Sequence, residues 1–137
     1  MSIILDSSAT LAWAFPEERT DAILQLFKQI ADYGAVVPEL WRIEVANVLN
    51  QGIRRGRIKT ADRKRILANL ESLSIGFDWE TPKHVWGRTL ELTDLHQLTV
   101  YDATYLELAL RLALPLATLD DDLRNAARQE GVRLLGK

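Results

Sequence analysis

The sequence lacks cysteine altogether and holds two histidines and one methionine among its 137 residues. Disulfides, thiolate metal sites and cysteine nucleophiles are therefore excluded, and the absence of cysteine agrees with a reducing compartment. No apolar run approaches the ~20 residues that a membrane span needs. The N-terminal stretch has no basic start, and Asp6 breaks its apolar run, unlike an export signal. We expect a cytoplasmic protein that does not associate with membranes.

A large excess of one charge is also missing, since 17 basic and 19 acidic residues leave a net charge of −2. The net charge alone does not favour a polyanionic partner. Bound cations would offset any clustered acids, however, so a nucleic-acid substrate remains possible. The length and the 47% hydrophobic content predict one domain, residues 1–137, with a core of its own.

Short apolar runs alternate with amphipathic segments along the chain. Residues 3–5, 35–37 and 116–119 are typical of strands buried on both faces, and 74–77 and 132–135 are further strand candidates. Helices are expected at 9–15, from Pro16 to Ile30, at 40–53, from Thr60, from Thr81 to Leu95, at 100–113 and after Asp120. This alternation predicts an α/β sandwich with a mostly parallel sheet.

Three aspartates lie where predicted elements begin or end. Asp6 ends the first strand, Asp120 ends the strand at 116–119, and Asp102 begins the apolar stripe of the helix at 100–113. The carboxyl edge of an open α/β sheet is where ligands bind, so these acids are candidates for one site. Asp6 could instead simply cap the following helix.

Glu44 is the most unusual charged residue in the sequence. It lies among the inward positions Trp41, Val45 and Leu49 of its predicted helix. A buried carboxylate must be protonated, paired with a base or bound to metal. A salt bridge to an arginine is the structural alternative to a functional role.

Seven basic residues and one acid lie between positions 54 and 65. Arg54, Arg55 and Arg57 are candidates for contacts with RNA phosphates, and a solvated helix turn is an equally good interpretation. His84 and His96 are too far apart for a two-histidine metal motif, and we expect them at the surface or at helix ends.

The separated acids favour a hard divalent cation. Like charges held together repel unless a cation lies between them. Mg²⁺ and Mn²⁺ prefer oxygen ligands, and no histidine or cysteine lies nearby to favour zinc.

Taken in order, the motifs resemble those of the PIN-domain family, most closely the ribonuclease toxins of the VapC type found in toxin–antitoxin pairs. The motifs are D-x-S at Asp6 and Ser8, the inward Glu44, YDA at Asp102, and LATLD at Thr118 and Asp120. The resemblance implies a three-layer sandwich with a five-stranded sheet, a homodimer, an antitoxin partner and an RNA substrate.

The resemblance also implies roles for single residues. Asp6, Glu44, Asp102 and Asp120 would be catalytic in a Mg²⁺- or Mn²⁺-dependent endoribonuclease, and Asp6, Asp102, Asp120 and Asp122 would be the metal ligands. Ser8 and Thr118 would support them. The family position after T-x-D varies, so the resemblance leaves Asp121 and Asp122 as alternatives, and Asp122 is the one favoured here.

Other functions are less consistent with the sequence. Ser8 stands where an aspartate-nucleophile phosphatase has its second aspartate, and neither G-x-G-x-x-G nor the P-loop pattern occurs. The remaining alternative is a catalytically silent PIN-like module that binds RNA or a protein.

Overall fold

The computed structural model describes all residues from 1 to 137 and contains one sheet of five strands. The strands are β1 (Ile3–Leu5), β2 (Ala35–Pro38), β3 (Ile75–Asp78), β4 (Leu116–Ala117) and β5 (Leu134–Leu135). Every neighbouring pair is parallel, in the order β3-β2-β1-β4-β5. The predicted α/β class is confirmed, and the sheet is entirely rather than mostly parallel.

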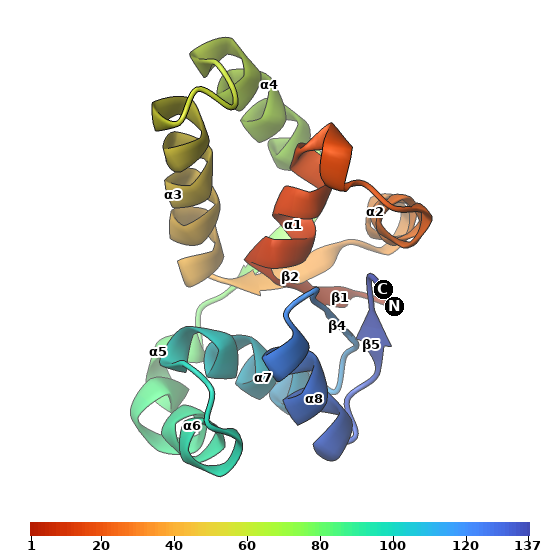
Figure 1. Ribbon diagram of the computed structural model, residues 1–137. Helices are drawn as coiled ribbons and strands as arrows, with labels where there is room; N and C mark the ends of the chain where they lie inside the picture. The colour runs from red at the N-terminus through yellow and green to blue at the C-terminus, as the bar shows by residue number, and fades with distance from the viewer.

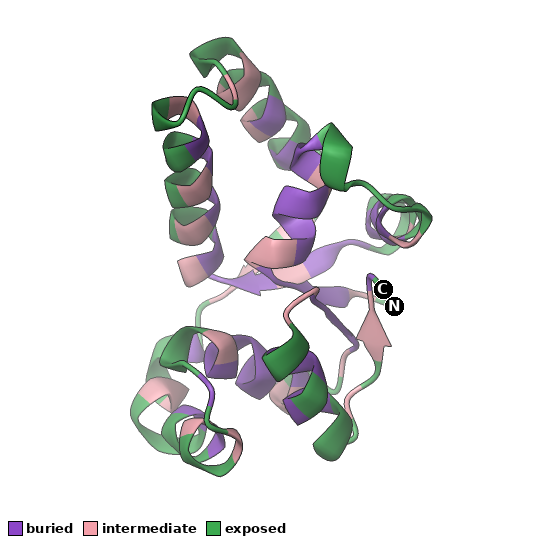
Figure 2. Ribbon diagram, viewed as in Figure 1, coloured by how far each residue is buried: buried purple, intermediate pink, exposed green.

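Helices cover both faces of this sheet, which gives the predicted three layers (Figure 1). One layer holds α1 (Ser7–Ala14), α2 (Asp21–Tyr33), α3 (Leu40–Arg54) and α4 (Thr60–Glu71). The other holds α5 (Thr81–His84), η2 (Val85–Thr89), α6 (Leu90–His96), α7 (Val100–Leu112) and α8 (Asp121–Gln129). The central strands β1 and β4, most of β2 and the sheet-facing sides of α1 and α7 are buried, as Figure 2 shows, whereas the edge strands β3 and β5 are not fully buried.

The centre of the sheet positions the candidate site. Ile3, Ile4 and Leu5 of β1 are fully buried, and Leu5 is in register with Ala117 of β4. Because the strands are parallel, their carboxyl ends share one edge of the sheet. The segments that follow β1 and β4, which carry Asp6 and Asp120, are thereby brought together.

The prediction that a helix begins at Pro16 is wrong. Pro16–Glu18 form only a short 3₁₀ turn, η1, and α2 begins at Asp21. Thr20 has an extended backbone, and its hydroxyl accepts a hydrogen bond from the Ile23 amide at 3.2 Å. This side-chain cap satisfies a free amide at the start of α2, so the helix begins there rather than at the proline.

The segment expected as one helix from Thr81 to Leu95 is helical but not uniform. The π-helical turn η2 separates α5 from α6. His96 is the last residue of α6, as predicted for a helix end, but its side chain is buried against Glu130, with 2.7 Å between His96 Nε2 and Glu130 Oε2. No helix in the structure combines the length and apolar character that crossing a membrane requires.

Candidate functional site

Asp6 lies between β1 and α1 and is 3% exposed. Its Oδ1 accepts hydrogen bonds from the Ala9 amide at 2.9 Å and from the Ser8 hydroxyl at 2.7 Å. Asp6 is therefore the cap of α1, as the structural interpretation held. Burial raises the pKa of Asp6 to about 6, against the lowering effect of its hydrogen bonds from Ala9, Thr118 and Ser8, and the charge of Asp102 raises it further.

Hydroxyl groups connect the end of β1 to the end of β4. Ser8 Oγ accepts a hydrogen bond from the Leu119 amide at 3.0 Å and lies 3.4 Å from Thr118 Oγ1. Thr118 Oγ1 accepts from the Asp120 amide at 3.1 Å. Asp120 in turn caps α8, since its Oδ2 accepts from the Leu123 amide at 2.8 Å. These bonds fix Asp6 and Asp120 on one rigid framework.

Asp102 is the acid whose pKa several of the other predicted acids raise. It lies in the first turn of α7, which Thr99 caps through the Asp102 amide at 3.1 Å. Burial raises the pKa of Asp102 to about 6, and the negative charges of Asp120, Glu44 and Asp122 raise it further. Asp102 also raises the pKa of Asp6. The structure therefore brings the predicted acids within electrostatic reach of one another around Asp102.

Glu44 projects from α3 and is partly buried. One of its oxygens, Oε1, accepts a hydrogen bond of 2.5 Å from the Tyr105 hydroxyl. The arginine salt bridge that the sequence left open is not formed. Sequence reasoning missed Tyr105, although its place on the buried side of α7, three residues after Asp102, was a usable signal.

None of the five predicted acids makes an ion pair, although the chain has 17 basic residues. The neighbouring Asp121 differs, because Lys137 Nζ lies 2.9 Å from its Oδ1 and the side chain is exposed. Asp122, by contrast, is one of the negative charges that raise the pKa of Asp102. Negative charge is therefore concentrated at this edge of the sheet without an ion pair to a protein cation. Burial lowers the pKa of the neighbouring Arg124 guanidinium and the charge of Asp6 partly counteracts this, but Arg124 donates its hydrogen bonds to the carbonyls of Thr118 and Leu135 and not to a carboxylate.

A second group of acids, elsewhere in the fold, is paired with an arginine. Glu107 of α7 is 2% exposed and lies 2.7 Å from Arg111, which also contacts Asp78 at the end of β3 at 2.7 Å. Burial raises the pKa of Asp78, but the hydrogen bonds from Arg111 and Thr81 outweigh it and hold this pKa below its usual range. Glu107 was not recognised as a buried acid from the sequence.

The donor set around Asp102 suits a hard cation, because every side-chain donor is an oxygen. No three His, Asp or Glu side chains are gathered tightly enough to form a ready-made metal cage. Mg²⁺ does not need one, since it usually keeps several waters beside one or two carboxylates. The residues present therefore fit a hydrated divalent ion.

The basic candidates differ from one another in their contacts. Arg57 lies 2.6 Å from Glu17, and its guanidinium is 3.8 Å from the centre of the Phe15 ring. Arg54 and Arg55 make no ion pair and lie at the C-terminal end of α3. That end is about 15 Å along the helix from Glu44 at 1.5 Å per residue.

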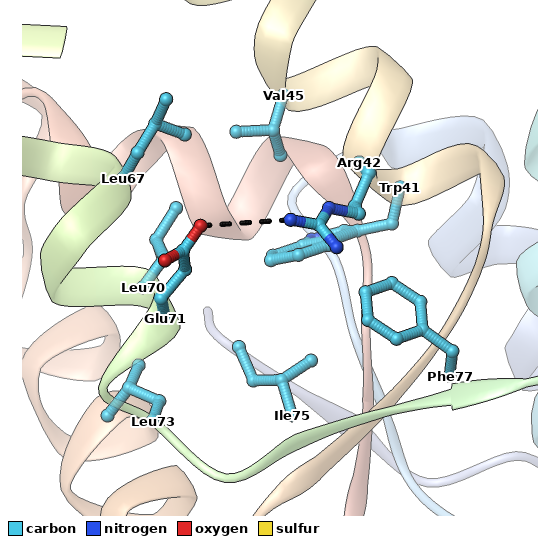
Figure 3. A pocket seen from close by; sticks show the side chains of 9 residues that line it. All are labelled: Trp41, Arg42, Val45, Leu67, Leu70, Glu71, Leu73, Ile75 and Phe77. Atoms are coloured by element: carbon cyan, nitrogen blue, oxygen red, sulfur yellow. Dashed lines mark ion pairs between the residues drawn. The ribbon is translucent and has the colours of Figure 1, made fainter. Parts of the chain in front are cut away.

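Two cavities flank α3. One has a volume of about 500 Å³ and extends from Ser8 to Arg57, with Leu11, Ala12, Phe15, Glu18, Val48 and Leu119 also lining it. The other, of about 350 Å³, lies between α3, α4 and β3 beneath the Arg42–Glu71 ion pair of 3.7 Å (Figure 3). None of the five acids lines either cavity, so neither is the chemical centre itself, and only the first comes close to it, at Ser8.

Comparison with known proteins places the chain in a family. The PIN domain model matches residues 3–129, and the chain belongs to the PIN-domain family. It is 30% identical to Ribonuclease VapC3 of Pyrobaculum aerophilum over 123 residues, which cover 90% of this chain and 92% of the relative. The resemblance drawn from the sequence motifs is thereby confirmed.

Solved structures share the fold. The crystal structure of PAE2754 from Pyrobaculum aerophilum aligns with a TM-score of 0.71 and 24% identity, covering 98% of this chain and 89% of that one. FitAcB from Neisseria gonorrhoeae aligns with a TM-score of 0.56 and 14% identity, over 97% and 96% of the two chains.

Proposed function

We propose that this chain, as a single PIN-like domain over residues 1–137, is a Mg²⁺- or Mn²⁺-dependent endoribonuclease that acts in the cytoplasm as the toxin of a toxin–antitoxin pair. The observation that carries the proposal is the group of carboxylates around Asp102, none of which forms an ion pair within the protein. Similarity to a protein named as a ribonuclease supports the substrate class.

In the proposed reaction, water cleaves an RNA phosphodiester bond. A bound Mg²⁺ or Mn²⁺ supplies positive charge that lowers the pKa of water and stabilises negative charge on the phosphate oxygens. Asp6, Asp102 and Asp120 would hold the ion, with Asp122 as a further ligand. Ser8 and Thr118 keep the ends of β1 and β4 in place.

Glu44 has a separate proposed role as the proton acceptor. Its Oε1 is engaged by Tyr105, whereas Oε2 makes no hydrogen bond to the protein. A carboxylate held at one oxygen keeps the other free to take a proton from the attacking water.

The RNA strand is proposed to leave the acids along the cavity from Ser8 towards the basic end of α3. Arg54 and Arg55 have no carboxylate partners and are free to contact phosphates, whereas Arg57 must first give up its contact with Glu17. Arg57 therefore contributes less than the other two to this proposed RNA contact.

The test of the proposed activity compares cleavage of single-stranded RNA with Mg²⁺, with Mn²⁺ and with EDTA. Cleavage that needs the ion and stops in EDTA is expected. A binding module without catalysis would instead retain RNA affinity in EDTA and cleave under no condition.

Protein partners are part of the same proposal. Trp86 is 91% exposed on η2 and Leu95 is 65% exposed on α6, which leaves apolar side chains available to a second copy in a homodimer. The apolar cavity in Figure 3 offers a contact surface to an antitoxin. Light scattering on the purified chain should give twice its 15.5 kDa mass; a monomer at all concentrations contradicts the dimer.

A further inference from the structure

Tyr105 occupies an unusual place for a tyrosine. It is 1% exposed, on the side of α7 that packs against the sheet, and its hydroxyl is directed at a carboxylate of another helix. Glu44 has no basic partner. The Tyr105 hydroxyl is the hydrogen-bond donor that the protein supplies to this carboxylate. Without this bond, Glu44 would be free to turn about its side-chain torsions.

The bond also connects two parts of the candidate site. Tyr105 and Asp102 lie three residues apart on α7, so they occupy neighbouring positions on one rigid helix. Glu44 comes from α3, in the other helix layer (Figure 1). The Tyr105 hydroxyl therefore sets where Glu44 lies relative to Asp102.

The chemistry of a buried phenol suits this task. Burial raises the pKa of Tyr105 far above its usual range, and the charge of Glu44 raises it further, so the hydroxyl remains a donor. A hydrogen bond from a neutral donor orients a carboxylate and leaves its negative charge in place. An arginine would orient the carboxylate too, but its positive charge would offset that of the acid. The phenol ring is 1% exposed, so the packing around it restricts its movement.

We infer that Tyr105 is a positioning residue for the reaction, which holds Glu44 at Oε1 so that Oε2 faces the proton it accepts. The inference rests on the proposed nuclease function and goes beyond it in assigning a role to a residue outside the acidic motifs. A purely structural role would affect stability but not the catalytic step in particular.

The test uses Tyr105→Phe, which removes the hydroxyl and keeps the ring. With purified full-length chain and single-stranded RNA, kcat should fall roughly ten- to hundredfold, the order expected when a reacting group is misplaced. KM should change by less than about twofold, since the lost interaction serves the chemical step. Thr104→Val is the matched control, because it also removes one hydroxyl hydrogen bond from buried α7, to the Val100 carbonyl at 2.8 Å.

The two variants separate the alternatives. A kcat for Tyr105→Phe within about twofold of wild type, or an equal loss in Thr104→Val, overturns the inference. The inference is also overturned if the whole loss of kcat/KM in Tyr105→Phe comes from a higher KM.

A second measurement does not depend on activity. In EDTA, the free energies of unfolding of Tyr105→Phe, of Glu44→Met, which removes both carboxylate oxygens, and of the double variant form a thermodynamic cycle. Non-additive values support the contact, and additive values overturn it. If wild type cleaves no RNA while the cycle is non-additive, the proposed function fails and the catalytic role of Tyr105 fails with it, but the Tyr105–Glu44 contact stands.

Discussion

The single residue that best reports on the site is Asp102. Burial and three neighbouring negative charges already raise its pKa, so the folded protein gains nothing from its charge unless a cation is bound. Asp102 is not the cap of α7, because the capping hydrogen bond is accepted by the Thr99 hydroxyl and not by the Asp102 carboxylate. The charge of this residue can therefore be removed without removing a cap.

The first prediction follows for Asp102→Asn. The amide keeps the shape of the side chain but removes its charge, so Mn²⁺ affinity measured by calorimetry should fall at least about tenfold, the lower end of what even outer partners of metal ligands contribute. Stability in EDTA should hold or rise, because repulsion is relieved. Asp121→Asn is the control, since Asp121 is exposed and contacts Lys137. Equal Mn²⁺ affinity in the two variants would refute a metal site around Asp102.

At the scale of elements, the two ends of α3 are proposed to do different work. Glu44 lies near its beginning and the free basic residues Arg54 and Arg55 near its end. The helix would thus separate the reacting phosphate from phosphates further along the strand. Arg57, in the loop after α3, is held by Glu17 and adds less.

The second prediction concerns this basic end. Changing Arg54 and Arg55 to glutamine should weaken RNA binding and lower the slope of log affinity against log salt by roughly 0.7 for each lost phosphate contact with a single strand. Arg57→Gln should change the slope less, since it first breaks an ion pair within the protein. Fluorescence titrations at several salt concentrations measure both. An unchanged slope for the Arg54 and Arg55 double variant excludes their contact with RNA.

A third prediction concerns the charge network that joins α7 to the end of β3. Arg111→Met leaves the buried Glu107 without its partner, and breaking a buried pair on one side costs about 3–5 kcal/mol. Urea unfolding should show a loss of that order. Arg65→Met, which breaks an exposed pair with Asp62, should cost at most about 1 kcal/mol. Similar losses for both would mean that the Arg111 network is not a buried one.

At the scale of the whole molecule, the acids make the metal-free fold sensitive to pH. The folded pKa of Asp6 is about 6, above its value of about 3.9 in an unfolded chain, so the folded state binds the proton more tightly. The stability that this group contributes is fully present below about pH 4 and is lost as the pH rises through about 6.

This gives the fourth prediction. In EDTA, the difference in unfolding free energy between wild type and Asp6→Asn should move against wild type as the pH rises from about 4 to about 7. Urea unfolding at several pH values measures it, and the groups that do not interact with Asp6 cancel between the two proteins. A difference that is constant across this range would mean that Asp6 has no raised pKa.

Much of the architecture could be predicted from the sequence, because it depends on local patterns. The fully apolar run at residues 3–5 fixes a buried central strand, and the stripe that Asp102 begins fixes α7. The start of α2 was missed because Thr20 was a better cap than the proline four residues earlier. The π-helical turn at 85–89 could not be predicted, because no periodic pattern of apolar residues in the sequence marks it.

The contacts within the site could be predicted less well, because they join residues distant in sequence. The positions of Asp6, Asp102 and Asp120 follow from strand and helix ends. The partner of Glu44, 61 residues away at Tyr105, and that of Asp78, 33 residues away at Arg111, follow only from how α3, α7 and β3 pack. The pairing of Arg57 with Glu17 is of the same kind.

The most direct measurement of the central claim is end-group analysis of RNA cleaved by the purified, antitoxin-free chain. Ribonucleases that use the RNA's own 2′-hydroxyl commonly depend on a pair of histidines, whereas here His96 is bound to Glu130 and does not belong to the acidic site. Attack by water with release of the 3′-oxygen predicts 5′-phosphate and 3′-hydroxyl ends, formed with Mg²⁺ or Mn²⁺ and not in EDTA. Products with 2′,3′-cyclic phosphate ends, or full activity in EDTA, would contradict the account and leave Asp6, Glu44, Asp102 and Asp120 with structural roles only.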